Sequence, residues 1–268
     1  MHVHFLDPYR PRPSLVHDLD PRVKLVLLLA FIFTNTLLPV GAWPVFVLMF
    51  SLILAVEVLS ELGVGYVLRR SVLALPFILA AFPLLFTIKG TTLFTFPLGN
   101  WVLSVSLAGL ERFLSIAFKS WVSLQAAIVF AASTSFPDIL VAMRAIHIPR
   151  LLVAIFGLMW RYLFVLVDEV LRLMRARLAR SGQNAVAGYK SGGSLLWRAR
   201  VAGGMAGSLF LRGFERSDRI YTAMLSRGYD GEVRTLSQPG LSLTHWVIIV
   251  LGFALLSALL GVAVLFWG

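Results

Sequence analysis

Five long apolar stretches dominate the pattern of hydrophobic and polar positions along the chain, and a long, more polar segment separates the fourth from the fifth. Each has about the length of a helix that crosses a bilayer, roughly 17–25 residues. Trp246 and Trp267 bracket the last stretch, as interfacial aromatics bracket a membrane span. We therefore expect five transmembrane helices, at Val23–Pro39, Ala42–Leu59, Ser71–Ile88, Leu107–Ala132 and His245–Trp267.

A sixth apolar stretch, Leu151–Val167, is ambiguous. Arg161 lies in its middle, where a lipid-facing arginine costs about 2.5–3.5 kcal/mol. If this stretch also crossed, the basic segment that follows would lie outside the cell, against the positive-inside rule. We therefore expect a helix packed under or partly into the bundle, with a sixth crossing as the open alternative.

The positive charge of the chain is concentrated in one segment, Arg172–Arg234. This segment holds twelve Lys and Arg against four acids, which is +8 of the total net charge of +11. Such a block cannot cross a bilayer and marks the cytoplasmic side. Arg10, Arg12, Arg22 and Lys24 precede the first span. The sequence thus predicts a cytoplasmic N-terminus and, after five crossings, a C-terminus outside.

Helix-capping signals divide the charged part of the chain into one short and two long helices. Ser135 has the capping-box form and opens a short helix that ends near Ile146. Pro149 favours the start of a long helix that runs to Arg180. Ser194 caps a second long helix, and Gly228 is expected at its C′ position. The chain is then one all-α membrane domain, residues 1–268, with four spans in 1–133, a cytosolic module in 135–230 and the last span in 245–267.

Gly203 and Gly207 lie four residues apart in the second long helix. Small residues at this spacing share a helix face and allow two backbones to approach closely. Because a glycine inside a helix costs up to about 1 kcal/mol, we expect a compensating contact. The prediction is that the two long helices cross at these glycines.

Composition and motifs argue against a chemical active site. Hydrophobic residues make up 59 % of the chain, mean hydropathy is +0.86 and cysteine is absent. The chain has no Walker A phosphate loop, no H-E-x-x-H motif and no nucleophile elbow. His2 and His4 alternate near the N-terminus but are too few for a tight metal site. In a membrane protein the basic pI reflects cytosolic charge, so a nucleic-acid partner is not expected.

Two arginines end the two long helices, in the sequences Ala179-Arg180-Ser181 and Ser226-Arg227-Gly228. An arginine in the last helical turn complements the helix dipole, by about 0.3–1 kcal/mol. Alternatively, both arginines project as charged tips toward an acidic groove on a partner, where the guanidinium fork suits carboxylates and carbonyls. Spacing by itself leaves both interpretations open.

Three segments of the chain resemble the CbiQ/EcfT family, the transmembrane (T) components of energy-coupling-factor (ECF) importers. They are the run Tyr221–Gly231 with its A-M-x-x-R-G-Y pattern, the run Met159–Glu169, and Leu19–Leu25. The resemblance covers nearly the whole chain. In this family, Ala-Arg-Gly signatures end two crossed coupling helices that dock on a pair of ABC ATPase subunits. By position, Arg180 and Arg227 match those arginines; Ser181 replaces the first glycine and Ser226 the second alanine.

The resemblance implies a non-catalytic coupling subunit in the cell (inner) membrane of a prokaryote. ATP and Mg would be bound by the partner ATPases, and cobalt or nickel by a substrate-binding membrane (S) component, with a small accessory membrane subunit as a further partner. This chain itself would bind no cofactor. The entry run and the Met224–Gly231 run are most like the cobalt branch. A T component for a vitamin, a stand-alone secondary transporter and an intramembrane enzyme are the alternatives.

The topology has a direct test, because the chain contains no cysteine. A single cysteine placed at Ser191 is expected to resist a membrane-impermeant thiol reagent in intact cells and to react after lysis. A cysteine added after Gly268 should react in intact cells. Labelling of the Ser191 variant in intact cells would contradict the five-span topology.

Overall fold

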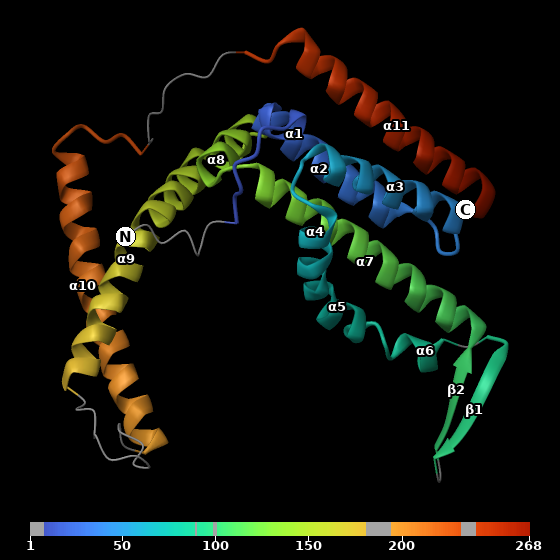
Figure 1. Cartoon of the computed structure of the whole chain (residues 1–268), viewed down its shortest axis with the longest axis horizontal. Coiled ribbons are helices and arrows are strands. Elements are labelled where there is room, and N and C mark those ends of the chain that lie inside the picture. Colours follow the sequence, from blue (N-terminus) through green and yellow to red (C-terminus); the bar gives the residue numbers. More distant parts are fainter. Residues whose placement is uncertain (1–7, 89, 99–100, 181–193, 232–239) are drawn as a thin grey trace. The chain divides into compact units, whose positions relative to one another are not determined.

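The structure is a computed structural model that describes residues 8–88, 90–98, 101–180, 194–231 and 240–268 (Figure 1). Most of the described residues are helical, as the hydrophobic pattern predicts. The elements in order are α1 (Leu15–Asp18), α2 (Pro21–Leu37), α3 (Trp43–Leu59), α4 (Val64–Ser71), a 3₁₀ turn (Val72–Ala74), α5 (Leu75–Ala80), α6 (Leu84–Thr87), β1 (Thr92–Leu98), β2 (Trp101–Ser106), α7 (Leu107–Ser133), α8 (Phe136–Ala145), α9 (Arg150–Arg180), α10 (Leu195–Leu225) and α11 (Leu243–Trp267).

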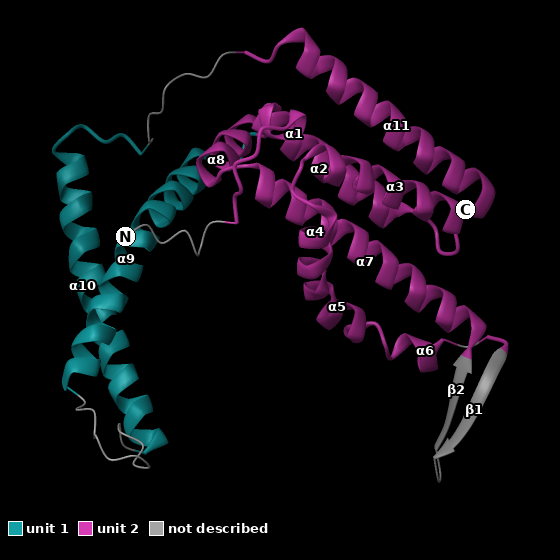
Figure 2. Cartoon of the chain, viewed as in Figure 1, with its two compact units in different colours: residues 1–3, 147–237 teal, residues 4–146, 238–268 magenta. Residues whose placement is uncertain are grey.

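The chain forms two compact units (Figure 2). The larger unit, residues 4–146 and 238–268, contains α1 to α8, the β-hairpin and α11; the smaller unit, residues 1–3 and 147–237, contains α9 and α10. The short helix α8 packs on α2 in the larger unit, whereas the sequence grouped it with the two long helices. The all-α membrane fold with two long crossed helices is confirmed.

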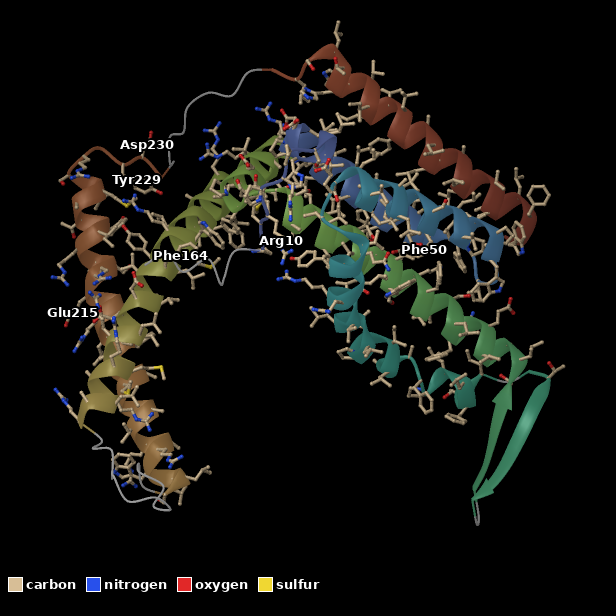
Figure 3. The ribbon with its side chains drawn as sticks, viewed as in Figure 1. Arg10, Phe50, Phe164, Glu215, Tyr229 and Asp230 are labelled. Carbon is tan, nitrogen blue, oxygen red and sulfur yellow. The ribbon has the colours of Figure 1, made fainter. Side chains whose placement is uncertain are left out.

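Helix α7 is the centre of the larger unit, because α2, α3, α4, α5 and α6 all contact it. Aromatic rings join it to α3: Phe46 lies 5.9 Å from Phe118, and Phe50 stacks on Trp121 at 5.2 Å (Figure 3). Helix α11 packs on α2, where a Cβ on Gly252 would lie 2.5 Å from Leu27 Cδ2. A larger residue at position 252 would therefore force the Leu27 side chain to move.

Hydrogen bonds join α2 to α7 near both ends of α2. Lys24 Nζ donates to the carbonyl oxygen of Ser133 at 3.1 Å, and Asn35 Nδ2 donates to Ser123 Oγ at 2.8 Å. Lys119 Nζ donates to the carbonyls of Thr36 and Leu38, at the C-terminal end of α2. These contacts satisfy carbonyls that a helix end leaves unpaired, and they fix the antiparallel register of the two helices.

The third predicted span, Ser71–Ile88, is not one continuous helix. The chain passes from α4 through a 3₁₀ turn into α5, and a further turn at residues 81–83 separates α5 from α6. Pro76 lies in the first turn of α5, and Pro83 caps α6. Proline has no N–H and clashes with the preceding turn, so these two residues account for the divided path.

Four helical segments are long and apolar enough to cross a membrane: residues 64–87 taken together, α7, α9 and α11, within the described part of the chain. Helix α3 is equally apolar but has 17 residues. Since α9 belongs to this set by length and composition, the alternative of a crossing at Leu151–Val167 stays open.

A two-stranded antiparallel hairpin, β1 with β2, lies between α6 and α7 in the chain. Its register pairs Thr92 with Ser106 and Leu98 with Trp101. Aromatic and β-branched residues in both strands favour extended backbone. The pair Gly99-Asn100 between the strands is a hairpin signal in the sequence.

In the smaller unit α9 and α10 cross (Figure 1). Glu169 on α9 accepts a hydrogen bond from Arg212 Nη1 on α10 at 2.9 Å, and a Cβ on Gly213 would lie 3.9 Å from Leu166 Cδ2. The predicted crossing at Gly203 and Gly207 is wrong, because a Cβ on either glycine would meet nothing within 4 Å. Gly203 lies ten residues before Gly213, about 15 Å along the helix, so the long side chains near the ion pair decide where the helices meet.

Alanine substitutions should distinguish a glycine that faces open space, Gly203, from one that is closely packed, Gly109. Gly203→Ala is expected to leave the thermal midpoint unchanged or to raise it, because alanine favours a helix by about 1 kcal/mol and meets no neighbour. Gly109→Ala should lower the midpoint, because its Cβ would lie 2.9 Å from Ser106 Oγ and 3.0 Å from the Leu84 and Leu85 carbonyl oxygens. Thermal unfolding of the purified chain in one detergent is the measurement. If Gly203→Ala lowered the thermal midpoint as much as Gly109→Ala does, Gly203 would have to lie in the contact between the two helices.

Candidate functional site

Helix α10 ends in a Schellman motif that exposes Arg227. The Tyr229 N–H donates to the Met224 carbonyl at 3.0 Å, and the Gly228 N–H donates to the Leu225 carbonyl at 3.0 Å. Gly228 has φ +77°, the left-handed conformation that favours glycine at C′. The prediction of Gly228 as the C′ residue is confirmed. Ser226, Arg227 and Gly228 are all exposed, and Tyr229 and Asp230 follow directly at the end of the helix (Figure 3).

Helix α9 carries Ala179 and Arg180 as its last two residues, and both are exposed. Ser181, the third residue of that predicted signature, lies outside the described residues. The Pro149 carbonyl accepts from the Leu152 and Val153 N–H groups, so proline caps this helix just before its first residue. Both arginines thus lie at helix ends, as the capping residues in the sequence predict.

The two terminal arginines differ from most arginines along the same helices. Arg172 and Arg212 both bind Glu169, while Arg175 and Arg219 each donate to a backbone carbonyl of their own helix. Within the described part of the chain, the side chains of Arg180 and Arg227 make neither a hydrogen bond nor an ion pair. Their guanidinium donors are therefore available to another molecule.

Glu169 on α9 lies where the two helices cross and binds Arg212 of α10. It lies beyond the apolar stretch of α9, its side chain is only 16 % exposed, and it accepts from Arg212 and from Arg172. Hydrogen bonds from Arg212 and Arg172 hold the pKa of the Glu169 carboxyl below its usual range. Sequence reasoning missed this residue, because no local pattern links positions 169 and 212.

The crossing divides each helix into two segments, or arms. Arg180 and Arg227 lie at the ends of two arms that extend in opposite directions from the crossing (Figure 1). From Glu169 to Arg180, and from Arg212 to Arg227, the chain advances about 16 Å and 22 Å at ~1.5 Å per residue. The end of α9 and the end of α10 lie at opposite ends of the crossed pair (Figure 1). One partner groove could not hold both arginines, but two separate grooves could.

Helix α10 buries little of its apolar surface against the rest of the described chain. None of its 31 residues is buried, and α9 buries only Val153 and Ala154. Close to the crossing Phe210 is 71 %, Leu211 63 % and Phe214 61 % exposed. Large exposed apolar patches mark protein or membrane contacts.

No group of three His, Asp or Glu residues that could hold a metal ion occurs among the residues the structure describes. His2 and His4 lie outside them. Sequence reasoning also missed Glu57, a fully buried carboxyl in α3 whose two oxygens have no hydrogen-bond partner. Glu57 lies four residues after Ile53, on the buried face of α3. The helical spacing of buried positions could therefore have indicated that this carboxyl is buried.

Comparison with known proteins identifies the family. Residues 13–239 match the family described as CbiQ, cobalt transport protein. The chain is 28 % identical to the energy-coupling factor transporter transmembrane protein EcfT of Lactococcus lactis, over 83 % of each chain. It is 29 % identical to the cobalt transport protein CbiQ of Salmonella typhimurium, over 50 % of this chain and 56 % of that protein.

A third relative, the nickel permease LarQ of Lactiplantibacillus plantarum, is 27 % identical over 56 % of this chain and 54 % of its own. The apolar helices, the crossed pair α9 and α10, and a family match over most of the chain agree with one another. The chain belongs to the CbiQ family of cobalt transport proteins, and it is a membrane transport component.

Proposed function

We propose that this chain is the energy-coupling transmembrane subunit of an ECF-type ABC importer for cobalt or nickel. In this role it links ATP hydrolysis by two partner ATPases to movement of a substrate-binding membrane subunit. The observation that carries the proposal is a pair of arginines, Arg180 and Arg227, which lie at the ends of crossed helices and have no partner among the residues that the structure describes.

Two opposite arms suit a pair of ATPase subunits. Each arm would place one guanidinium in a groove of one ATPase, where carboxylates and carbonyls accept its planar set of donors. Because both arms belong to one crossed pair, a change in the distance between the two ATPases would alter the crossing at Glu169 and Arg212. In this way the crossed helices would transmit a movement of the ATPases, which lie outside the membrane, to the membrane surface.

The exposed apolar residues of α10 would contact the substrate-binding membrane subunit. Phe210, Leu211 and Phe214 are adjacent to Arg212, which forms the crossing. A movement of the crossing would therefore reach this surface directly. A bilayer surface and a small accessory membrane subunit are further contacts in the same assembly.

The metal assignment rests on relatives, one named for cobalt and one for nickel. We assign metal binding to the substrate-binding subunit, and ATP with Mg to the ATPases, so this chain binds no cofactor. A vitamin importer is the alternative, because the EcfT name of one relative does not specify a metal. The proposed location is the inner membrane of a prokaryote, with the N-terminus and the crossed helices cytoplasmic and the C-terminus outside.

Removing the terminal arginines should uncouple transport. Arg180→Ala and Arg227→Ala are each expected to lower metal uptake by the reconstituted complex at least five-fold, and the double variant more. The reason is the loss of charge-assisted hydrogen bonds, worth roughly 1.5–3 kcal/mol each. Arg→Lys at either position should restore only part, because an ammonium lacks the guanidinium fork. Uptake of cobalt and nickel, compared side by side, is the measurement.

Arg219→Ala is the matched control, because Arg219 is exposed on α10 but donates to the carbonyl of Glu215 in its own helix. It should leave uptake unchanged. Full uptake by the double alanine variant, or complete rescue by lysine, would support a helix-dipole role instead. Normal ATPase docking with uptake of neither metal would favour the vitamin alternative.

Nucleotide chemistry should be absent from the purified chain. It is expected to bind no ATP and to hydrolyse none, whereas the complex with its ATPases should do both, because the sequence has no Walker A loop. Saturable binding of labelled ATP to the chain by itself, measured by equilibrium dialysis, would overturn this division of roles.

A further inference from the structure

The larger unit contains an apolar cavity of about 350 Å³ between α1, α2, α3, α7 and α11. Of its lining residues, only Lys24 and Ser133 have polar side chains. The volume is in the range of small-molecule sites, roughly 300–1,000 Å³. Its apolar lining suits a hydrocarbon chain.

The two polar residues of the cavity lie together, at one end of the α2 segment that lines it. On α2 it is lined by Lys24, Leu27, Leu28 and Phe31, which share one helix face and span about 10 Å along the axis. The polar end is fixed by the hydrogen bond from Lys24 Nζ to the Ser133 carbonyl, at 3.1 Å. The other end is fixed by Phe31, which belongs to the hydrophobic core of the unit. A flexible apolar chain with a polar head matches this gradient.

Lys24 has capacity for one further hydrogen bond. Its ammonium donates to the carbonyls of His17 at 2.9 Å and Ser133 at 3.1 Å, and an ammonium has three donors. Both partners are neutral carbonyls, so the third donor can form a charge-assisted hydrogen bond to a phosphate oxygen.

Three carboxylates, on Asp18, Asp20 and Asp138, lie near enough to interact electrostatically with the Lys24 ammonium. Asp20 caps α2 through the Arg22 N–H, and Asp138 bonds to the Ser135 hydroxyl. Asp18 is exposed; among the described residues its carboxylate interacts electrostatically with Lys24 but forms neither a hydrogen bond nor a salt bridge. It lies next to Leu19, which lines the cavity. An anionic headgroup would be repelled here, whereas one with a phosphate and a primary ammonium would pair with both charges.

We propose that this cavity is a phospholipid site, in which one acyl chain lies along α2, the phosphate binds Lys24 and an ethanolamine ammonium binds Asp18. Because lipid tails are as apolar as leucine, filling the cavity confers little selectivity. The headgroup contacts determine which lipid binds. The bound lipid would fill the space between α11 and the α2–α3–α7 core.

Native mass spectrometry of the full-length chain, delipidated and titrated with defined lipids, tests the site. One phosphatidylethanolamine should bind at least ten-fold more tightly than phosphatidylglycerol or phosphatidylcholine. Lys24→Gln should weaken phosphatidylethanolamine binding at least ten-fold. Asp18→Asn should abolish the preference over phosphatidylglycerol while phospholipid still binds, and since Asp18 is exposed this variant is expected to fold.

Lys119→Gln is the matched control, because Lys119 also donates to two carbonyls but does not line the cavity; it should bind lipid as wild type does. A phosphatidylethanolamine with a photoreactive group near the end of its acyl chain should label α2 near Phe31 or α11 near Leu256. Unchanged binding by Lys24→Gln, equal affinity for the three lipids, or labelling confined to other surfaces would overturn the proposal.

Discussion

The hydrogen bonds between α2 and α7 are the contacts on which the larger unit depends. In a bilayer, helices gain no hydrophobic free energy by associating, so close packing and interhelical polar contacts determine how they pair. Asn35 donates both to Ser123 and to the carbonyl of Lys119, while Lys119 donates back to carbonyls at the end of α2. Each helix thus satisfies backbone or side-chain groups of the other. A shift of one residue would leave several polar groups unpaired in the interior.

The remaining helices pack on this pair mainly through apolar contacts, with a hydrogen bond from Trp121 Nε1 on α7 to Ser71 Oγ on α4 as one polar addition. Helix α3 uses stacked aromatic rings, and α11 uses the close approach of Gly252 to Leu27. The N-terminal segment is held by a backbone hydrogen bond from Arg10 to Ala132, with the Arg10 guanidinium 3.8 Å from the centre of the Tyr66 ring (Figure 3). Polar contacts therefore set the register, and apolar contacts fill the space around it.

The crossed pair of helices is held in a different way. Its main polar contact is the Glu169–Arg212 ion pair, in which the arginine side chain is 58 % exposed. Exposed ion pairs contribute only about 0–1 kcal/mol, and α10 buries none of its residues. The two helices thus have little of their own core to hold one angle. Partners that bind the ends and the apolar surface would set that angle, which is the property a coupling element needs.

Local signals in the sequence were sufficient for much of the fold and part of the site. Apolar runs predicted the positions of α2, α3, α7 and α11, since their hydrophobic positions are contiguous in the chain. The Ser135 and Ser194 caps and the Gly228 C′ residue were also read correctly. These features depend on residues within one helical turn of each other. For the same reason, the sequence could place Arg180 and Arg227 at helix ends.

Only the tertiary structure decided which distant residues meet. It moved the helix crossing from Gly203 and Gly207 to the region of Glu169 and Arg212, where long charged side chains offer a pairing that periodicity does not reveal. It divided the third span, because two prolines outweigh a favourable apolar composition. It also showed that the terminal arginines lack partners within the described chain, whereas Lys24 and Lys119 bind carbonyls. Such pairings depend on the spatial arrangement of segments up to about a hundred residues apart, and a pattern within a single helix carries no information on that arrangement.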